Sequence, residues 1–223
     1  MAWLYGALAV FQKDARLELR TRFALNALGL FVAAAVLLVR FALGNTAVTP
    51  PMAAALLWIV ILFAAVVGLG RAFIVEEERG TVLLLQLTLP ATSVYVGKLA
   101  FNIAITLALN LVAAFVFWLF VSPEIYAFWL LATTLVLGAV GLAGATTLLS
   151  AIIARTVSSG PLLAVLSFPV LIPLLFSVVK LTQLAFEPGA TWGAAATDLT
   201  ALVGYGGLMI TASVLLFEHV WRD

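Results

Sequence analysis

The chain has 223 residues, of which 65% are hydrophobic and 9% are charged, and its formal net charge is +1. Soluble domains are typically about 25% charged, so the composition excludes a soluble globular protein and indicates an integral membrane protein. The absence of cysteine excludes disulfides, thiolate metal sites and a cysteine nucleophile.

Six charge-free runs supply the predicted membrane spans, and most exceed the roughly 20 residues that a helix needs to cross a bilayer. These runs are 23–39, 41–70, 99–123, 125–154, 156–179 and 199–217. The pattern predicts an all-α integral membrane protein in which residues 1–223 form one domain with six transmembrane helices. Lys180 and Asp198 are predicted to bound an external loop between the fifth and sixth spans.

The distribution of Lys and Arg predicts the orientation of the spans. Of the 11 basic residues, all but Arg40 and Lys180 fall at one set of span ends. The positive-inside rule makes that side cytoplasmic, and six spans then place both termini in the cytoplasm. The first 22 residues lack a compact apolar core followed by a small-residue cleavage site, so we expect no cleaved signal peptide.

Residues 1–22 are predicted to form an amphipathic helix ahead of the first span. An apolar stripe faces a basic cluster: Leu4, Leu8, Phe11, Ala15 and Leu19 opposite Lys13, Arg16 and Arg20. This pattern suits a helix that lies in the membrane interface. The alternative is a cytoplasmic overhang of the first span.

The third and fourth spans, predicted near residues 94–121 and 124–154, carry polar and small residues at helical spacing. Asn102, Thr106 and Asn110 share one face, where they either hydrogen-bond a neighbouring helix or line a path for a substrate. Gly141 and Ala145 form a small-xxx-small pair that allows close approach of another backbone, in this chain or in a second subunit.

Two prolines interrupt the fifth span. Pro169 and Pro173 deprive the carbonyls of Val165 and Pro169 of their usual helical donors. We therefore expect a kink or a break within the membrane, which is either a fixed bend or a hinge.

The segment 76–98, EEERGTVLLLQLTLPATSVYVGK, joins the second and third spans and is too short to cross the bilayer and return. Glu76, Glu77, Glu78 and Arg79 place its start at the cytoplasmic surface, because a charge at the bilayer centre costs about 2.5–3.5 kcal/mol on insertion scales. Lys98 marks the interface at its far end. We interpret the glutamates as solvated, since consecutive helical residues point about 100° apart and do not converge on a metal.

Within this cytoplasmic segment, residues 81–89 predict a short helix with two apolar faces. One face carries Leu83, Leu84 and Leu87, and the other carries Val82, Leu85 and Leu89. Such a helix needs two dry partners. The membrane or the ends of the chain's own helices can cover one face, and we expect another protein to cover the other.

The sequence contains no motif of a catalytic or nucleotide-binding site. HExxH, GxSxG and GxxxxGK[ST] are all absent, and the single histidine is His219. We therefore expect a non-enzymatic chain with no metal or cofactor of its own, and composition offers no signal for nucleic-acid binding.

Two stretches carry a resemblance to known families. ERGTVLLLQLTLPATSVYVGKL at 78–99 resembles the segment of ABC-2 type transporter permeases in which a coupling helix contacts an ATPase subunit. LAGATTLLSAIIARTVSSGPLLAVLSFPVLIPLLFSVV at 142–179, with the VWRD terminus, resembles the haem exporter protein B (CcmB) family. The second resemblance covers essentially the whole chain.

The resemblance implies the permease subunit of a cytochrome c maturation complex in the bacterial inner membrane. Its implied partners are a P-loop ATPase that binds ATP with Mg²⁺, a haem-handling membrane subunit and a small membrane subunit. ATP hydrolysis would support haem loading or release on a periplasmic chaperone, with haem itself ligated by a partner. The implied ATPase-docking residues are Glu76, Glu77, Glu78, Arg79, Leu83, Leu84 and Leu87.

One departure from the family pattern affects the docking residues. Many members carry an acidic residue early in the leucine run, where this chain has Leu83, so the charged contacts are expected from 76–79 instead. Three other functions stay open on the sequence alone. They are a self-contained secondary transporter or channel, an ABC-2 permease for another substrate, and a non-catalytic assembly scaffold.

Overall fold

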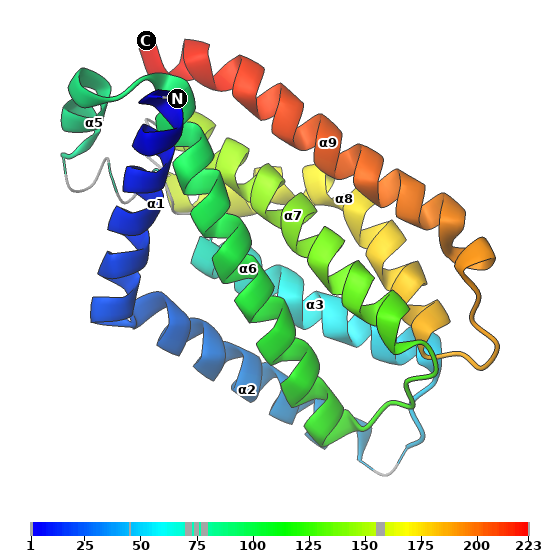
Figure 1. Ribbon diagram of the computed structural model, residues 1–223. Coiled ribbons are helices and arrows are strands. Elements are labelled where there is room, and N and C mark those ends of the chain that lie inside the picture. The colour runs from blue at the N-terminus through cyan, green and yellow to red at the C-terminus, as the bar shows by residue number, and fades with distance from the viewer. Residues whose placement is uncertain are drawn as a thin grey trace.

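A computed structural model describes residues 2–44, 46–69, 73, 76, 80–154 and 159–222, and every long regular element in these ranges is an α-helix (Figure 1). The helices are α1 (Ala2–Thr21), α2 (Phe23–Leu43), α3 (Pro50–Leu69), α5 (Val82–Thr88), α6 (Ala91–Val121), α7 (Phe128–Ile153), α8 (Ser159–Ala185) and α9 (Trp192–Arg222). The predicted all-α class is confirmed for the described residues.

Five helices contain stretches long and apolar enough to cross a membrane. They are Leu25–Leu43, Ala91–Val121, Phe128–Ile153, Val165–Ala185 and Trp192–Phe217. The apolar part of α3 that can be assessed, Pro50–Val66, is shorter. The chain is therefore a multi-pass helical membrane protein, and the sixth predicted span depends on α3.

The break between α1 and α2 falls where the sequence predicts the interfacial helix to end. Arg22 has φ 51° and ψ 20°, the left-handed conformation that side chains other than glycine seldom adopt. This single residue interrupts the helix, and the backbone N–H of Leu25 donates to Glu18 Oε1 at 2.9 Å across the break. As a result α1 and α2 run in different directions (Figure 1).

The main hydrophobic core joins α2, α3, α7, α8 and part of α9 to the second half of α6. At its centre Trp58 is fully buried and its Nε1 donates to Thr182 Oγ1 at 2.8 Å. Gly138 makes room for that ring, because a Cβ there would lie 2.4 Å from it. At Gly141 a Cβ would lie 2.1 Å from Leu174, so this small residue serves a contact within the chain.

The predicted bounds of the loop between the fifth and sixth spans, Lys180 and Asp198, are wrong. α8 continues to Ala185 and α9 begins at Trp192, which leaves a short connection. Lys180 Nζ and Asp198 Oδ2 lie 3.0 Å apart and form an ion pair between the two helices. Because each charge neutralises the other, neither has to end its helix.

Candidate functional site

The short helix α5 has the two faces that the sequence predicts. Leu83, Leu84 and Leu87 are 65%, 62% and 78% exposed, whereas Leu85 is 8% exposed. Gly80, with φ 67°, precedes the helix, and Pro90 follows it in an extended conformation. Figure 1 shows α5 standing clear of the bundle at the end where both termini lie.

The inner face of α5 packs on a second hydrophobic cluster. Leu85 contributes to it together with Phe73, Val94, Tyr95 and Phe217. The ring of Phe217 lies 5.1 Å from each of the rings of Phe73 and Tyr95. Because Tyr95 belongs to α6 and Phe217 to α9, this cluster joins Leu85 of α5 to the ends of two long helices.

An ionic cluster of Lys13, Asp14, Glu76 and Lys98 lies beside this hydrophobic base. Lys98 Nζ is 2.9 Å from Glu76 Oε1 and 3.1 Å from Asp14 Oδ2. Lys13 Nζ is 2.5 Å from Glu76 Oε1 and 3.2 Å from Asp14 Oδ1. Thr81 Oγ1 donates to the second oxygen of Glu76. The ionic cluster thus connects α1, the segment before α5, and α6.

The structure corrects the interpretation of Glu76 as a solvated charge. The Glu76 side chain is 7% exposed and that of Lys98 is 2% exposed. Lys13 of α1 and Lys98 of α6 surround the Glu76 carboxylate in place of water. Both lie outside the charge run at 76–79, so that run alone does not reveal them. Glu77, Glu78 and Arg79 lie outside the described residues.

The ionic cluster shifts the protonation equilibria of its members. Burial alone would raise the pKa of Glu76, but the charge of Lys98 and hydrogen bonds from Lys13, Thr81 and Lys98 outweigh it and lower the pKa from 4.5 to about 2. Burial likewise opposes the charge on Lys13, yet its contacts with Glu76 and Asp14 raise its pKa. Both groups are therefore charged at neutral pH.

We expect Glu76 to make the stability of the chain pH-dependent. Its pKa is lower in the folded state, so its stabilising effect is complete above pH 4.5 and is lost as the pH falls toward about 2. Thermal unfolding of the detergent-solubilised protein should show a steeper acid decline in the wild type than in Glu76→Gln. Glu187→Gln, which removes a carboxylate bonded only to Gln183 within the described residues, is the control. Parallel declines for wild type and Glu76→Gln would contradict this expectation.

Close packing holds α1 along the first half of α6. Ser93 Oγ donates to the carbonyl of Trp3 at 2.9 Å. A Cβ on Gly97 would lie 2.5 Å from the backbone oxygen of Ala7 and 2.7 Å from Val10 Cβ. Of the predicted apolar stripe, Leu4, Leu8 and Leu19 are exposed while Phe11 and Ala15 are half-buried, and the placement of this stripe in the membrane interface stays a prediction.

Gly97→Ala is expected to weaken this contact. Replacing a helical glycine by alanine normally stabilises by up to about 1 kcal/mol, but here the added methyl meets backbone and should cost about 1–3 kcal/mol instead. Gly204→Ala is the matched control, because a Cβ at Gly204 meets nothing within 4 Å. A lower Tm for Gly97→Ala and an unchanged or higher Tm for Gly204→Ala would agree with the packing, whereas equal shifts would refute it.

The polar stripe of α6 contacts α7. Asn102 Nδ2 donates to Thr147 Oγ1 at 2.7 Å, and Asn110 Nδ2 donates to the carbonyl of Leu135 at 2.8 Å. Thr106 Oγ1 donates to the carbonyl of Asn102 at 2.6 Å within α6. All three residues are buried, which matches the helix-contact alternative in this conformation.

The expected break at the two prolines is absent from this conformation. Pro169 and Pro173 both lie inside α8, which is continuous through them. Next to them, Tyr205 of α9 donates its hydroxyl to the carbonyl of Val170 at 2.9 Å. Ser177 Oγ donates to the carbonyl of Pro173 at 3.4 Å. Side-chain donors thus contact this stretch of the helix, and the alternatives of a fixed bend and a hinge both remain predictions.

Among the residues that the structure describes, no group of three or more His, Asp or Glu side chains could hold a metal ion. The side chain of His219 lies outside the description. The candidate site has two described parts, the exposed apolar face of α5 and the buried ionic cluster.

Comparison with known proteins agrees with the sequence resemblance. No curated protein matches the chain. The family described as CcmB protein matches residues 5–217, nearly the whole chain. The chain therefore belongs to the CcmB family, and this membership implies a membrane component of a haem-export system for cytochrome c maturation.

Proposed function

We propose that the chain is the permease subunit of an ABC transporter complex for cytochrome c maturation. In this proposal it transmits the motion of a P-loop ATPase, which binds ATP with Mg²⁺, to haem loading or release on a periplasmic chaperone. The observation that carries the proposal is α5, whose three exposed leucines face outward while its opposite face is fixed to the bundle.

The exposed face of α5 has the character of a protein-binding surface. Seven residues of helix extend about 10 Å, so α5 cannot cross a membrane. Clustered exposed apolar side chains rimmed by polar residues mark interaction sites. Leu83, Leu84 and Leu87 form such a cluster, and Glu77, Glu78 and Arg79 are predicted to add charged contacts beside it.

Motion of α5 would pass to the long helices by two routes. Along the chain, only Leu89 and Pro90 separate α5 from α6. Across space, Leu85 belongs to the same hydrophobic cluster as Tyr95 and Phe217, and Glu76 is bonded to Lys13 and Lys98. A displaced α5 would therefore move the adjoining ends of α1, α6 and α9 together.

The positions of the two chain termini support a bacterial inner-membrane protein with six spans and with both termini in the cytoplasm. Figure 1 places both termini and α5 at one end of the bundle, and one pocket joins residues of the 44–50, 120–124 and 186 regions at the other. Both termini at the same end require an even number of crossings. In this proposal α3 supplies the sixth, shielded from lipid by the buried contacts of Leu57, Trp58 and Ile61.

A haem-handling membrane subunit and a small membrane subunit are the further partners that we propose. The buried polar residues Asn102, Thr106 and Asn110 are engaged in helix contacts, so haem ligation is assigned to a partner. With haem ligated by a partner, this chain has a mechanical role and no cofactor of its own.

Co-purification tests the proposal. The tagged chain, solubilised in mild detergent, should bring down a P-loop ATPase that is expressed from the same locus, and ATP hydrolysis by that complex should be needed for cytochrome c maturation. Failure to recover any such ATPase would refute it. Solute transport by the purified chain alone in liposomes would favour a self-contained transporter instead.

A further inference from the structure

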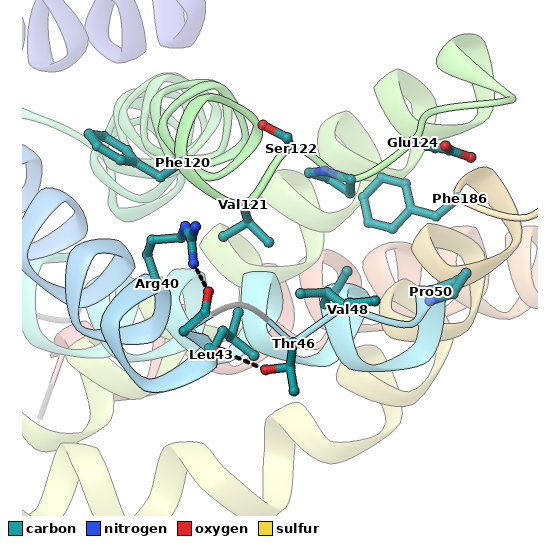
Figure 2. Close-up of a pocket in the computed structure, with 14 residues that line it drawn as sticks. Arg40, Leu43, Thr46, Val48, Pro50, Phe120, Val121, Ser122, Glu124 and Phe186 are labelled. Carbon is teal, nitrogen blue, oxygen red and sulfur yellow. Dashed lines mark hydrogen bonds between the residues drawn. The ribbon is translucent and has the colours of Figure 1, made fainter.

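A pocket of about 590 Å³ (Figure 2) lies at the end of the bundle that is opposite α5 in Figure 1. Its walls come from the connection between α2 and α3, the connection between α6 and α7, and Phe186 after α8. Its volume is within the range of ligand-binding pockets, about 300–1,000 Å³. Two charged residues line it, Arg40 and Glu124.

Arg40 brings unused donors to this pocket. Its Nη1 donates to the carbonyl of Gly44, and no carboxylate among the described residues pairs with the guanidinium. A guanidinium has five N–H donors, so several remain for a ligand. Lys180, the other cation at this end, is already paired with Asp198.

Glu124 brings the opposite charge to the other side of the pocket. Figure 2 shows Arg40 and Glu124 on opposite sides, with Val121 and Phe186 between them. Tyr126 donates its hydroxyl to Glu124 Oε2, and no cation in the described part of the chain pairs with the carboxylate. A purely anionic ligand would be attracted by Arg40 and repelled by Glu124, whereas a zwitterion would be attracted by both.

The surroundings place the pocket at a lipid–water boundary. Trp118, Tyr126 and Trp129 are exposed near this end of α6 and α7, as in the aromatic belts of membrane proteins. Phe120, Val121 and Phe186 give the pocket an apolar wall. A ligand held here would have its charged group in the pocket and an apolar body along the helices.

We propose that this pocket binds a phosphoethanolamine group, with the phosphate on Arg40 and the primary ammonium near Glu124. The membrane source is a phospholipid with that headgroup, and the alternative source is the soluble compound. A primary ammonium can donate hydrogen bonds to a carboxylate, which a choline group cannot. The inference does not depend on whether the chain acts with an ATPase.

Competitive lipid retention by the purified full-length chain tests the site. Phosphatidylethanolamine, phosphatidylcholine and phosphatidylglycerol with identical acyl chains are supplied together in detergent, and bound lipid is counted by native mass spectrometry. We expect the wild type to retain phosphatidylethanolamine about fivefold over phosphatidylglycerol, the effect of one partly exposed ion pair. Glu124→Gln should lose this preference, and Arg40→Gln should retain less of all three lipids.

Matched variants keep the test specific. Glu187→Gln and Arg20→Gln remove the same charges outside the pocket and should behave as the wild type. Equal retention of the three lipids by the wild type, or equal losses in Arg40→Gln and Arg20→Gln, would overturn the proposal. Calorimetric binding of soluble O-phosphoethanolamine as tight as that of the lipid would overturn the assignment to a phospholipid.

Discussion

Leu84→Asp and Leu87→Asp should abolish ATP-driven cytochrome c maturation while the chain stays folded and inserted. Both leucines are more than half exposed, so a carboxylate there remains hydrated in the isolated chain. In a complex the same carboxylate would be buried on the proposed docking face without a partner. Central contacts of this kind are worth about 2 kcal/mol or more, so we expect roughly 30-fold weaker ATPase binding.

Two further variants separate docking from folding. Leu84→Met keeps the volume and apolarity of the side chain and should preserve maturation. Leu85→Asp places the charge on the buried face and should lower the Tm. Membrane insertion, Tm, ATPase co-purification and maturation are measured for each. Wild-type maturation in the two exposed-face Asp variants would show that the docking face lies elsewhere.

Local patterns explain why α5 could be predicted from the sequence. The separation of Leu83, Leu84 and Leu87 from Val82, Leu85 and Leu89 depends only on the geometry of about two helical turns. Glycine before the helix and proline after it define its ends. The structure exposes the first set and buries Leu85, as this periodicity predicts.

The ionic cluster could not be predicted in the same way. Lys13 and Glu76 are 63 positions apart, and Lys98 and Asp14 are 84 positions apart, so only the packing of α1 on α6 brings them together. Consecutive charges in a sequence usually indicate solvation, and the run at 76–79 gave no sign that Glu76 is buried. The signal available was the pair of small residues Gly6 and Gly97, each of which lets the other helix approach closely: a Cβ on Gly6 would lie 3.2 Å from Ser93, and one on Gly97 would lie 2.5 Å from the backbone oxygen of Ala7.

For the long helices, too, the sequence predicts positions but not the contacts between helices. Charge-free runs predict where most helices lie, but they do not tell whether Asn102 or Asn110 faces a substrate path or a neighbour. Nor do they reveal that Lys180 pairs with Asp198 and allows both helices to continue past their charges. Each of these outcomes depends on which helix is adjacent.

Glu76→Gln and Lys98→Gln are expected to uncouple α5 from the bundle, because each removes one of the two partners of a buried charge; Glu76 keeps Lys13 and Lys98 keeps Asp14. Removing one member of a buried ion pair typically destabilises by about 3–5 kcal/mol. The leucine face of α5 is untouched, so the ATPase should still co-purify while maturation falls. This combination distinguishes the ionic cluster from the docking face, where binding itself is lost.

The double variant shows whether the two residues act through each other. If Glu76 and Lys98 stabilise the fold through their 2.9 Å contact, Glu76→Gln with Lys98→Gln should cost about 1–3 kcal/mol less than the sum of the single changes. Lys13 and Asp14 remain in the double variant and neutralise each other, at 3.2 Å. Strictly additive losses in the free energy of unfolding would mean that each residue stabilises its own surroundings. The ionic cluster would then not be the connection through which α5 moves α1 and α6.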